Sequence, residues 1–114
     1  MNIQIYTYKR NFDVQKAERF FKERRIPYQL VDLKKHALGG RELALFARKF
    51  GAQALVDRSP EALSHPIAHT DDPAYILDCL RENPKFLKTP LVRNGEQVTL
   101  GVDEAAWNLW VQKG

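Results

Sequence analysis

The opening stretch of the chain, Asn2–Leu33 with the sequence NIQIYTYKRNFDVQKAERFFKERRIPYQLVDL, decides the fold. Its first part is rich in β-forming residues, and two sets of side chains alternate there: Ile3, Ile5 and Thr7 against Gln4 and Tyr6. Alternation with a period of two is typical of a β-strand. The segment Asn2–Tyr8 is therefore predicted to form a first strand.

A helix and a second strand follow this segment. Asp13 is the expected N-cap of a helix that runs to about Arg25, and Pro27 stops it. One apolar stripe at helical spacing consists of Val14, Ala17, Phe20 and Phe21. The segment Tyr28–Leu33 is predicted to form the second strand. Because a helix connects the two strands, we expect them to be parallel, with a right-handed crossover.

The middle of the chain is predicted to be mainly helical. The dipeptide Gly39-Gly40 precedes a helix over Glu42–Phe50, which Gly51 ends. Residues 52–70 contain two prolines and little periodicity, which indicates a loop with one helical turn around Pro60–Leu63.

A third helix, a hairpin and a last helix complete the chain. Asp72-Pro73 is an N-cap followed by proline, which predicts a helix to about Glu82. The hairpin is predicted from two strands and the turn between them: Pro90–Arg93, Gln97–Leu100 and Asn94-Gly95. Asp103 is expected to cap the last helix, whose apolar anchors are Ala106, Trp107 and Trp110.

The order of these elements is strand–helix–strand, two helices, two strands and a helix. A parallel strand–helix–strand unit joined to an antiparallel hairpin and a closing helix is a thioredoxin-like α/β layout, with a mixed sheet flanked by helices. The chain has 114 residues, the length of one domain. We therefore predict a single thioredoxin-like domain over 1–114, with a helical insertion at about 40–84.

Composition limits the chemistry that the chain can perform. A single cysteine, Cys79, excludes an internal disulfide, a CxxC redox pair and any metal site that needs several thiolates. No apolar run approaches the ~20 residues of a membrane span, and no signal-like segment follows Met1. A cytoplasmic protein is expected.

The positive charge is concentrated in the first half of the sequence. The chain carries a formal net charge of +4, which divides into +7 for residues 1–50 and −3 for residues 51–114. Such a basic half favours an anionic ligand, nucleic acid or an acidic protein partner. Aromatic residues are not interleaved with the basic ones as they are where bases stack, so nucleic acid is not expected.

Several short motifs follow one another along the chain: Ile5-Tyr6, Lys16-Ala17, Glu42-Leu43, Phe50-Gly51, Ala54-Leu55-Val56, Ile76-Leu77-Asp78, Asn83-Pro84, Leu87-x-x-Pro90-Leu91-Val92 and Leu100-Gly101. In this order they resemble the arsenate reductase family and its Spx-type relatives, which combine a thioredoxin fold with a helical insertion. The resemblance covers essentially the whole chain. It implies the arsenate-reductase/Spx type of thioredoxin-like fold.

In that family a nucleophilic cysteine follows the first strand, where the N–H groups and dipole of a helix N-terminus stabilise its thiolate. By resemblance this cysteine corresponds to Asn11, whose amide forms neither a thiolate nor a disulfide. The family's oxyanion-binding arginines correspond to Thr89, Asp57 and Val102, with Arg58 one place beyond Asp57. The resemblance therefore implies a divergent member that is not an arsenate reductase.

We expect a binding pocket at this position, without a catalytic residue or a metal. The resemblance implies that the Thr89-Pro90 bond is cis, and that the residue before the proline offers its backbone to an extended peptide or to glutathione. Basic side chains at a helix N-terminus favour an anion. We expect a vestigial pocket for glutathione or another small anion, formed by Lys9, Arg10, Asn11, Asp13, Thr89 and Pro90. The alternative is a pair of exposed basic residues on a loop.

Two other candidates are weaker on chemical grounds. Cys79 falls in the third predicted helix, where a buried structural role is expected for a free cysteine. His65 and His69 have a spacing that binds zinc only on a helix, and Pro66 argues against a helix there. Solvated loop histidines are expected instead.

The resemblance and the missing cysteine together predict a non-catalytic binding or regulatory protein. Spx-type relatives act on RNA polymerase, so a protein partner, including the transcription machinery, is implied by resemblance. The alternative is a glutaredoxin- or arsenate reductase-like enzyme, a glutathione- or thiol-dependent oxidoreductase or transferase. There glutathione would supply the thiol, and Asn11 or a backbone N–H would stabilise its thiolate.

Overall fold

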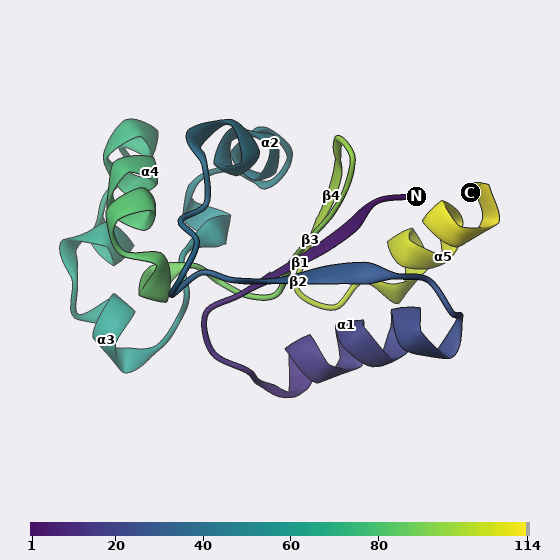
Figure 1. The fold of residues 1–114 in the computed structure, drawn as a ribbon. Coiled ribbons are helices and arrows are strands. Elements are labelled where there is room, and N and C mark those ends of the chain that lie inside the picture. Colours follow the sequence, from purple (N-terminus) through teal and green to yellow (C-terminus); the bar gives the residue numbers. More distant parts are fainter. Residues whose placement is uncertain (114) are drawn as a thin grey trace.

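The computed structural model describes residues 1–113 and contains a four-stranded sheet in the order β2-β1-β3-β4 (Figure 1). Its strands are β1 (Ile3–Thr7), β2 (Tyr28–Asp32), β3 (Leu91–Asn94) and β4 (Gln97–Leu100). Strand β1 is parallel to β2 and antiparallel to β3, and β4 is antiparallel to β3. This mixed sheet, flanked by helices, confirms the predicted thioredoxin-like α/β fold.

Within the described part of the chain, five α-helices and three short 3₁₀ helices flank the sheet. They are α1 (Phe12–Glu23), α2 (Gly40–Phe50), η1 (Gln53–Leu55), α3 (Pro60–Leu63), η2 (Pro66–His69), α4 (Pro73–Glu82), η3 (Pro84–Phe86) and α5 (Glu104–Lys113). Figure 1 shows α2, α3 and α4 in the left half of the molecule, with α1 and α5 in the right half. Across residues 1–113, none of the helices combines the length and the apolar character that a membrane crossing requires.

Helix α1 begins earlier than the sequence predicts. Its N-cap is Asn11 rather than Asp13, because Asn11 has an extended backbone and its side chain accepts the Val14 N–H. Asp13 instead lies in the first turn, where a negative charge is favourable near the helix N-terminus. The helix ends at Glu23, and Arg25 adopts a positive φ of 55°.

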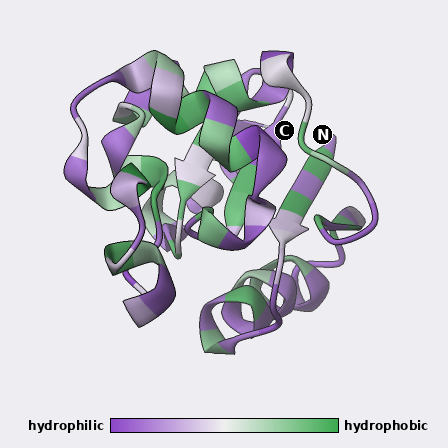
Figure 2. Ribbon diagram, turned by 90° about the vertical axis from the view of Figure 1, so that its left-hand side faces the viewer, coloured by the Kyte–Doolittle hydropathy of each residue, from purple (hydrophilic) through white to green (hydrophobic). Residues whose placement is uncertain are grey.

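Hydrophobic residues cover both faces of the sheet. On one face β1 and β3 pack against α1 and α5 through Ile3, Ile5, Ala17, Phe20, Phe21, Val92, Trp107 and Trp110. On the other face a larger cluster joins the sheet to α2 and α4 through Tyr6, Leu43, Phe46, Leu55, Ile76, Leu80, Leu91 and Val98, among others. Figure 2 shows the hydrophobic and hydrophilic residues that alternate along the helices. Strand β1 is central, so Tyr6 is buried although it faces away from Ile3 and Ile5.

The middle segment is more structured than predicted. The helical turn at Pro60–Leu63 and the helix that begins after Asp72 are confirmed. The 3₁₀ helices η1 and η2 lie within the expected loop over residues 52–70. Each is a single turn, too short for a periodic pattern in the sequence to indicate it.

The hairpin is confirmed, but its turn lies one residue later than predicted. Asn94 pairs with Gln97, so Asn94 ends β3 and the two turn residues are Gly95 and Glu96. Gly95 has a positive φ of 62°, which suits the first position of a type II′ turn. After β4, Asp103 caps α5 by accepting the Ala106 N–H at 3.0 Å, as predicted.

Candidate functional site

A cleft of ≈720 Å³ lies at the N-terminus of α1. The β1–α1 connection forms one wall, and the α3 region and η3 form the opposite wall. The side chains that line it are Tyr8, Lys9, Arg10, Asn11, Asp57, Ser59, Pro60, Glu61, Lys85, Leu87 and Thr89. We refer to this feature as the α1 cleft.

The side-chain amide of Asn11 caps the N-terminus of α1. The Asn11 Oδ1 atom accepts the Val14 N–H at 2.8 Å, and the Asn11 carbonyl accepts the Gln15 N–H at 3.0 Å. A helix N-terminus offers N–H groups that have no intrahelical partner, and one of them is satisfied here by the side chain. The amide therefore takes a position that would otherwise be open to a ligand or a thiolate.

Arg10 forms a charge pair with Glu18 of α1. Its Nη2 atom lies 2.6 Å from Glu18 Oε2, and the Glu18 side chain is only 8% exposed. The Tyr28 hydroxyl donates to Glu18 Oε1 at 2.9 Å. Partial burial of Tyr28, together with this hydrogen bond to a carboxylate, raises the pKa of Tyr28 to about 12. Glu18 thus neutralises Arg10 and holds it against α1.

A second charge pair lies on the opposite wall. Lys85 Nζ and Glu61 Oε1 are 2.7 Å apart, and both side chains are exposed. This contact lowers the pKa of Glu61 and raises the pKa of Lys85. Because Asp57 also lines the cleft, acidic and basic side chains face the same space.

The structure brings together four of the six residues predicted to form this pocket. Lys9, Arg10, Asn11 and Thr89 line the α1 cleft. Asp13, which is exposed, and Pro90, which is buried, are not among the residues that line it. Asp13 lies in the first turn of α1 and Pro90 directly precedes β3, so their part in a binding pocket stays a prediction. The Thr89-Pro90 peptide bond is cis.

Sequence reasoning missed the residues of the opposite wall. Glu61 and Lys85 are 24 positions apart and belong to different elements. Neither has a local motif, and only the tertiary fold brings them together at the cleft. Ser59 lies within the predicted loop over residues 52–70, and its hydroxyl caps α3 by accepting the Ala62 N–H.

Two of the three positions that, by the resemblance, correspond to oxyanion-binding arginines lie in the α1 cleft. Asp57 and Thr89 line it, whereas Val102 does not. Arg58 lines a different depression, beside His69 and Asp71. The cleft therefore retains these two positions but holds there a carboxylate and a hydroxyl, which cannot bind an oxyanion as a guanidinium does.

Cys79 and the two histidines lie outside the α1 cleft. Cys79 is half-buried on α4 and packs against the larger core cluster. His65 Nδ1 accepts the Ile67 N–H at 3.1 Å, and His69 Nε2 lies 2.6 Å from the Leu63 carbonyl oxygen. Within residues 1–113, no three His, Cys, Asp or Glu side chains are grouped so that they could hold a metal ion.

No protein-family model matches the sequence, and no curated protein matches it. Several solved structures do match the chain in fold. A YffB protein is 18% identical, with a TM-score of 0.82 over 94% of this chain and 96% of that one. A protein related to the ArsC family from Bacteroides fragilis is 20% identical, with a TM-score of 0.79 over 96% and 98%. An arsenate reductase from Vibrio cholerae is 15% identical, with a TM-score of 0.75 over 88% and 89%. The chain therefore has the fold of the arsenate reductase-related proteins.

Proposed function

We propose that this chain is a non-catalytic binding protein built on the arsenate reductase fold, and that its α1 cleft binds glutathione or a similar peptide-like anion. The observation that carries the proposal is the role of Asn11. Its amide oxygen caps α1 at 2.8 Å from the Val14 nitrogen, at the place where the resemblance requires a nucleophile. An amide has no thiol, so it can form neither a covalent arsenic adduct nor a mixed disulfide.

The charges of the α1 cleft support a ligand that carries both signs. Arg10 already pairs with Glu18, and Lys85 already pairs with Glu61. A simple oxyanion is best held by guanidinium groups that are free to bind it in a bidentate manner. Glutathione has an ammonium group and two carboxylates, so it can pair with basic and acidic side chains alike.

The backbone at the base of the α1 cleft supports a ligand with a main chain. Thr89 lines the cleft, and within residues 1–113 its N–H and C=O make no hydrogen bond to the protein. The neighbouring Lys88 N–H, by contrast, is bonded to the Leu55 carbonyl at 2.8 Å. A free N–H and C=O in one residue can pair with an extended peptide as a neighbouring strand does.

Titration of the isotopically labelled protein with reduced glutathione tests this proposal. Amide resonances of residues 9–14 and of Thr89 are expected to shift and to saturate. S-methylglutathione is expected to bind equally well, because binding here needs no free thiol. Lys9→Gln should weaken binding, whereas Lys22→Gln, an exposed cation at the far end of α1, should not. Silence up to millimolar glutathione would overturn the proposal.

Enzyme assays separate binding from catalysis. With glutathione present, neither arsenate nor a small disulfide is expected to turn over, and Cys79 should react far more slowly with thiol reagents in the folded protein than in the unfolded one. Turnover by the natural sequence would favour the glutathione-dependent enzyme instead. In Asn11→Cys, a thiol that is reactive at neutral pH would show that the electrostatic environment of the helix N-terminus is retained.

A further inference from the structure

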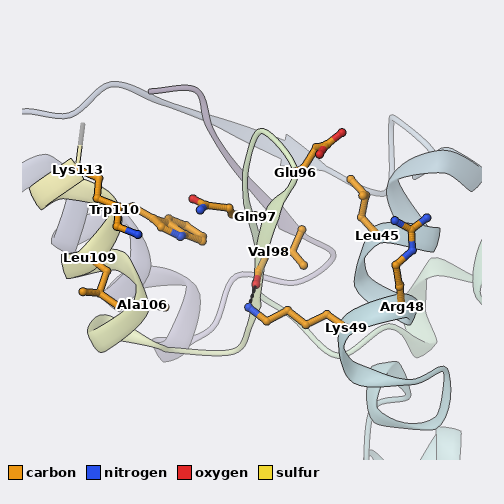
Figure 3. A pocket seen from close by; sticks show the side chains of 10 residues that line it. All are labelled: Leu45, Arg48, Lys49, Glu96, Gln97, Val98, Ala106, Leu109, Trp110 and Lys113. Atoms are coloured by element: carbon orange, nitrogen blue, oxygen red, sulfur yellow. Dashed lines mark hydrogen bonds between the residues drawn. The ribbon is translucent and has the colours of Figure 1, made fainter.

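A second cleft, of ≈490 Å³, follows the outer edge of β4. Figure 3 shows it between α2, which contributes Leu45, Arg48 and Lys49, and α5, which contributes Leu109, Trp110 and Lys113. We refer to it as the β4 groove. Strand β4 is the last strand of the sheet, so no other strand of the described chain covers this edge.

The backbone N–H and C=O groups of successive β4 residues point alternately toward β3 and toward the groove. The Gly101 N–H bonds to the Pro90 carbonyl, which fixes the ladder so that Thr99 and Gln97 form the hydrogen-bonded pairs with β3. Val98 lies between them, and its N–H and C=O therefore point away from β3. Lys49 Nζ donates to the Val98 carbonyl at 2.8 Å, which confirms this direction (Figure 3).

The side walls of the β4 groove are apolar and positively charged. Leu45, Leu109 and Trp110 supply the apolar surface, and Leu109 is 54% exposed. Arg48, Lys49 and Lys113 are all exposed, against a single acidic lining residue, Glu96. Within residues 1–113 none of these three cations forms a salt bridge. The groove thus has an excess positive charge that the described chain does not neutralise.

We propose that the β4 groove binds an acidic, extended segment of a partner protein, which adds to the sheet as a strand beside β4. The segment's main chain would bond to the Val98 N–H and C=O, as strands added to a sheet edge do. Its alternate side chains would contact Leu109 and Trp110, and its carboxylates would pair with Arg48 and Lys113. Lys49 moves from the Val98 carbonyl to a carboxylate of the segment.

The charge of the β4 groove favours such a partner over a second copy of the chain. Antiparallel pairing of two β4 strands would bring the same cations of both copies together, and like charges across an interface are unfavourable. A lysine over an edge strand also discourages self-pairing. An acidic segment removes both obstacles.

A synthetic peptide tests the proposal directly. The probe is an acetylated and amidated peptide that alternates glutamate with valine over about seven residues, a typical strand length. At saturation, hydrogen exchange of the Val98 amide is expected to slow by about tenfold or more, because that N–H gains a partner. Exchange at Gln97 and Thr99 should change little, because those N–H groups already bond to β3.

Charge variants and control ligands complete the test. Arg48→Glu combined with Lys113→Glu should weaken peptide binding by about tenfold or more. Lys16→Glu combined with Arg19→Glu, an exposed pair on α1, should leave it within about twofold. Replacing the peptide's glutamates with glutamine should weaken binding similarly.

Four results would overturn the proposal: no binding at millimolar peptide, binding without protection of Val98, equal competition by a single-stranded oligonucleotide, or protection of Val98 that depends on protein concentration alone. The last would assign the groove to a second copy of the chain. Because these results concern β4 and not the α1 cleft, they leave the glutathione proposal unaffected.

Discussion

The α1 cleft and the β4 groove both contain basic side chains, but they use their charge differently. In the α1 cleft Arg10 lies 2.6 Å from Glu18, and Lys85 lies 2.7 Å from Glu61. In the β4 groove Arg48 and Lys113 pair with no carboxylate of residues 1–113. A cation with an internal partner must exchange that partner for a ligand. A solvated cation only loses water.

Because of this difference, the two sites favour ligands of different charge. A ligand of the α1 cleft must offer both signs if it is to compensate the pairs that it disturbs. A ligand of the β4 groove gains most from negative charge alone. The basic half of the sequence is therefore not one anion site, because the β1–α1 connection and α2 place its cations in two separate electrostatic settings.

The largest expected loss of stability comes from removing Trp107, which packs α5 against the sheet and so keeps α5 in place beside the β4 groove. Trp107 is fully buried, packs 5.3 Å from the Phe20 ring, and donates its indole N–H to Thr99 Oγ1 at 2.8 Å. Trp107→Ala should lower the free energy of unfolding by about 3–5 kcal/mol, measured by urea denaturation. Leu109→Ala, on the exposed face of α5, should change it little. A loss below about 1 kcal/mol for Trp107→Ala would show that α5 is held otherwise.

Breaking the internal pair of the α1 cleft should have the next largest effect. Glu18→Ala removes the acceptor of both Arg10 and Tyr28, and we expect a loss of about 2 kcal/mol. Arg10 is 61% exposed and can return to water, so most of the loss should come from Tyr28 and from packing.

Glu18→Gln sharpens the comparison between the two sites. It releases the charge of Arg10 while it keeps the shape of the side chain. The α1 cleft should then resemble the β4 groove and bind acetate more tightly than the natural protein does, as judged by amide shifts at residues 9–14. Unchanged acetate binding would contradict the view that Glu18 neutralises this site.

A smaller loss is expected when the cap of α1 is removed. Asn11→Ala leaves the Val14 N–H without its side-chain acceptor and should lower the unfolding free energy by about 1 kcal/mol. Asn11→Asp should retain the stability, because a carboxylate caps equally well and carries the charge that a helix N-terminus favours. Equal losses in both variants would mean that Asn11 acts through contacts other than the cap.

Much of the fold could be predicted because its signals are local. Three examples are the apolar stripe of α1, the Asp72 cap and the Gly95 turn. Each depends only on residues a few positions apart in the sequence. The N-cap of α1 was misplaced because Asn11 and Asp13 are both good capping residues. Only the backbone conformation distinguishes them, and it is extended at Asn11.

The candidate sites depend on contacts between distant residues, which the sequence shows less well. The β1–α1 connection brings Lys9, Arg10 and Asn11 to the α1 cleft, and these were predicted. Glu61 and Lys85 were not, because they are 24 positions apart and only the tertiary fold brings them together. The β4 groove was not predicted either, since Lys49 and Val98 are 49 positions apart and neither belongs to a motif.

The free energy of unfolding at alkaline pH should depend on the Glu18–Tyr28 contact. The pKa of Tyr28 is raised from 10.0 to about 12 in the folded protein, so between these values the unfolded chain loses the proton that the folded chain keeps. The contribution of this contact to the free energy of unfolding is therefore fully present below pH 10 and is lost as the pH rises toward 12. Tyr28→Phe should flatten this fall in urea midpoints measured across the same range. Because Tyr28 is half-buried, the change should be modest.

The smallest effect on stability is expected at the opposite wall of the α1 cleft. Glu61 and Lys85 are exposed, and water screens such pairs strongly. Glu61→Gln should leave the urea midpoint unchanged within error, and it should return the pKa of Lys85 toward its ordinary value, which side-chain NMR can follow. The same variant should bind acetate more tightly, because Lys85 loses its internal partner. A measurable loss of stability would show instead that this pair shapes the cleft, and the contrast with the β4 groove would then be structural as well as electrostatic.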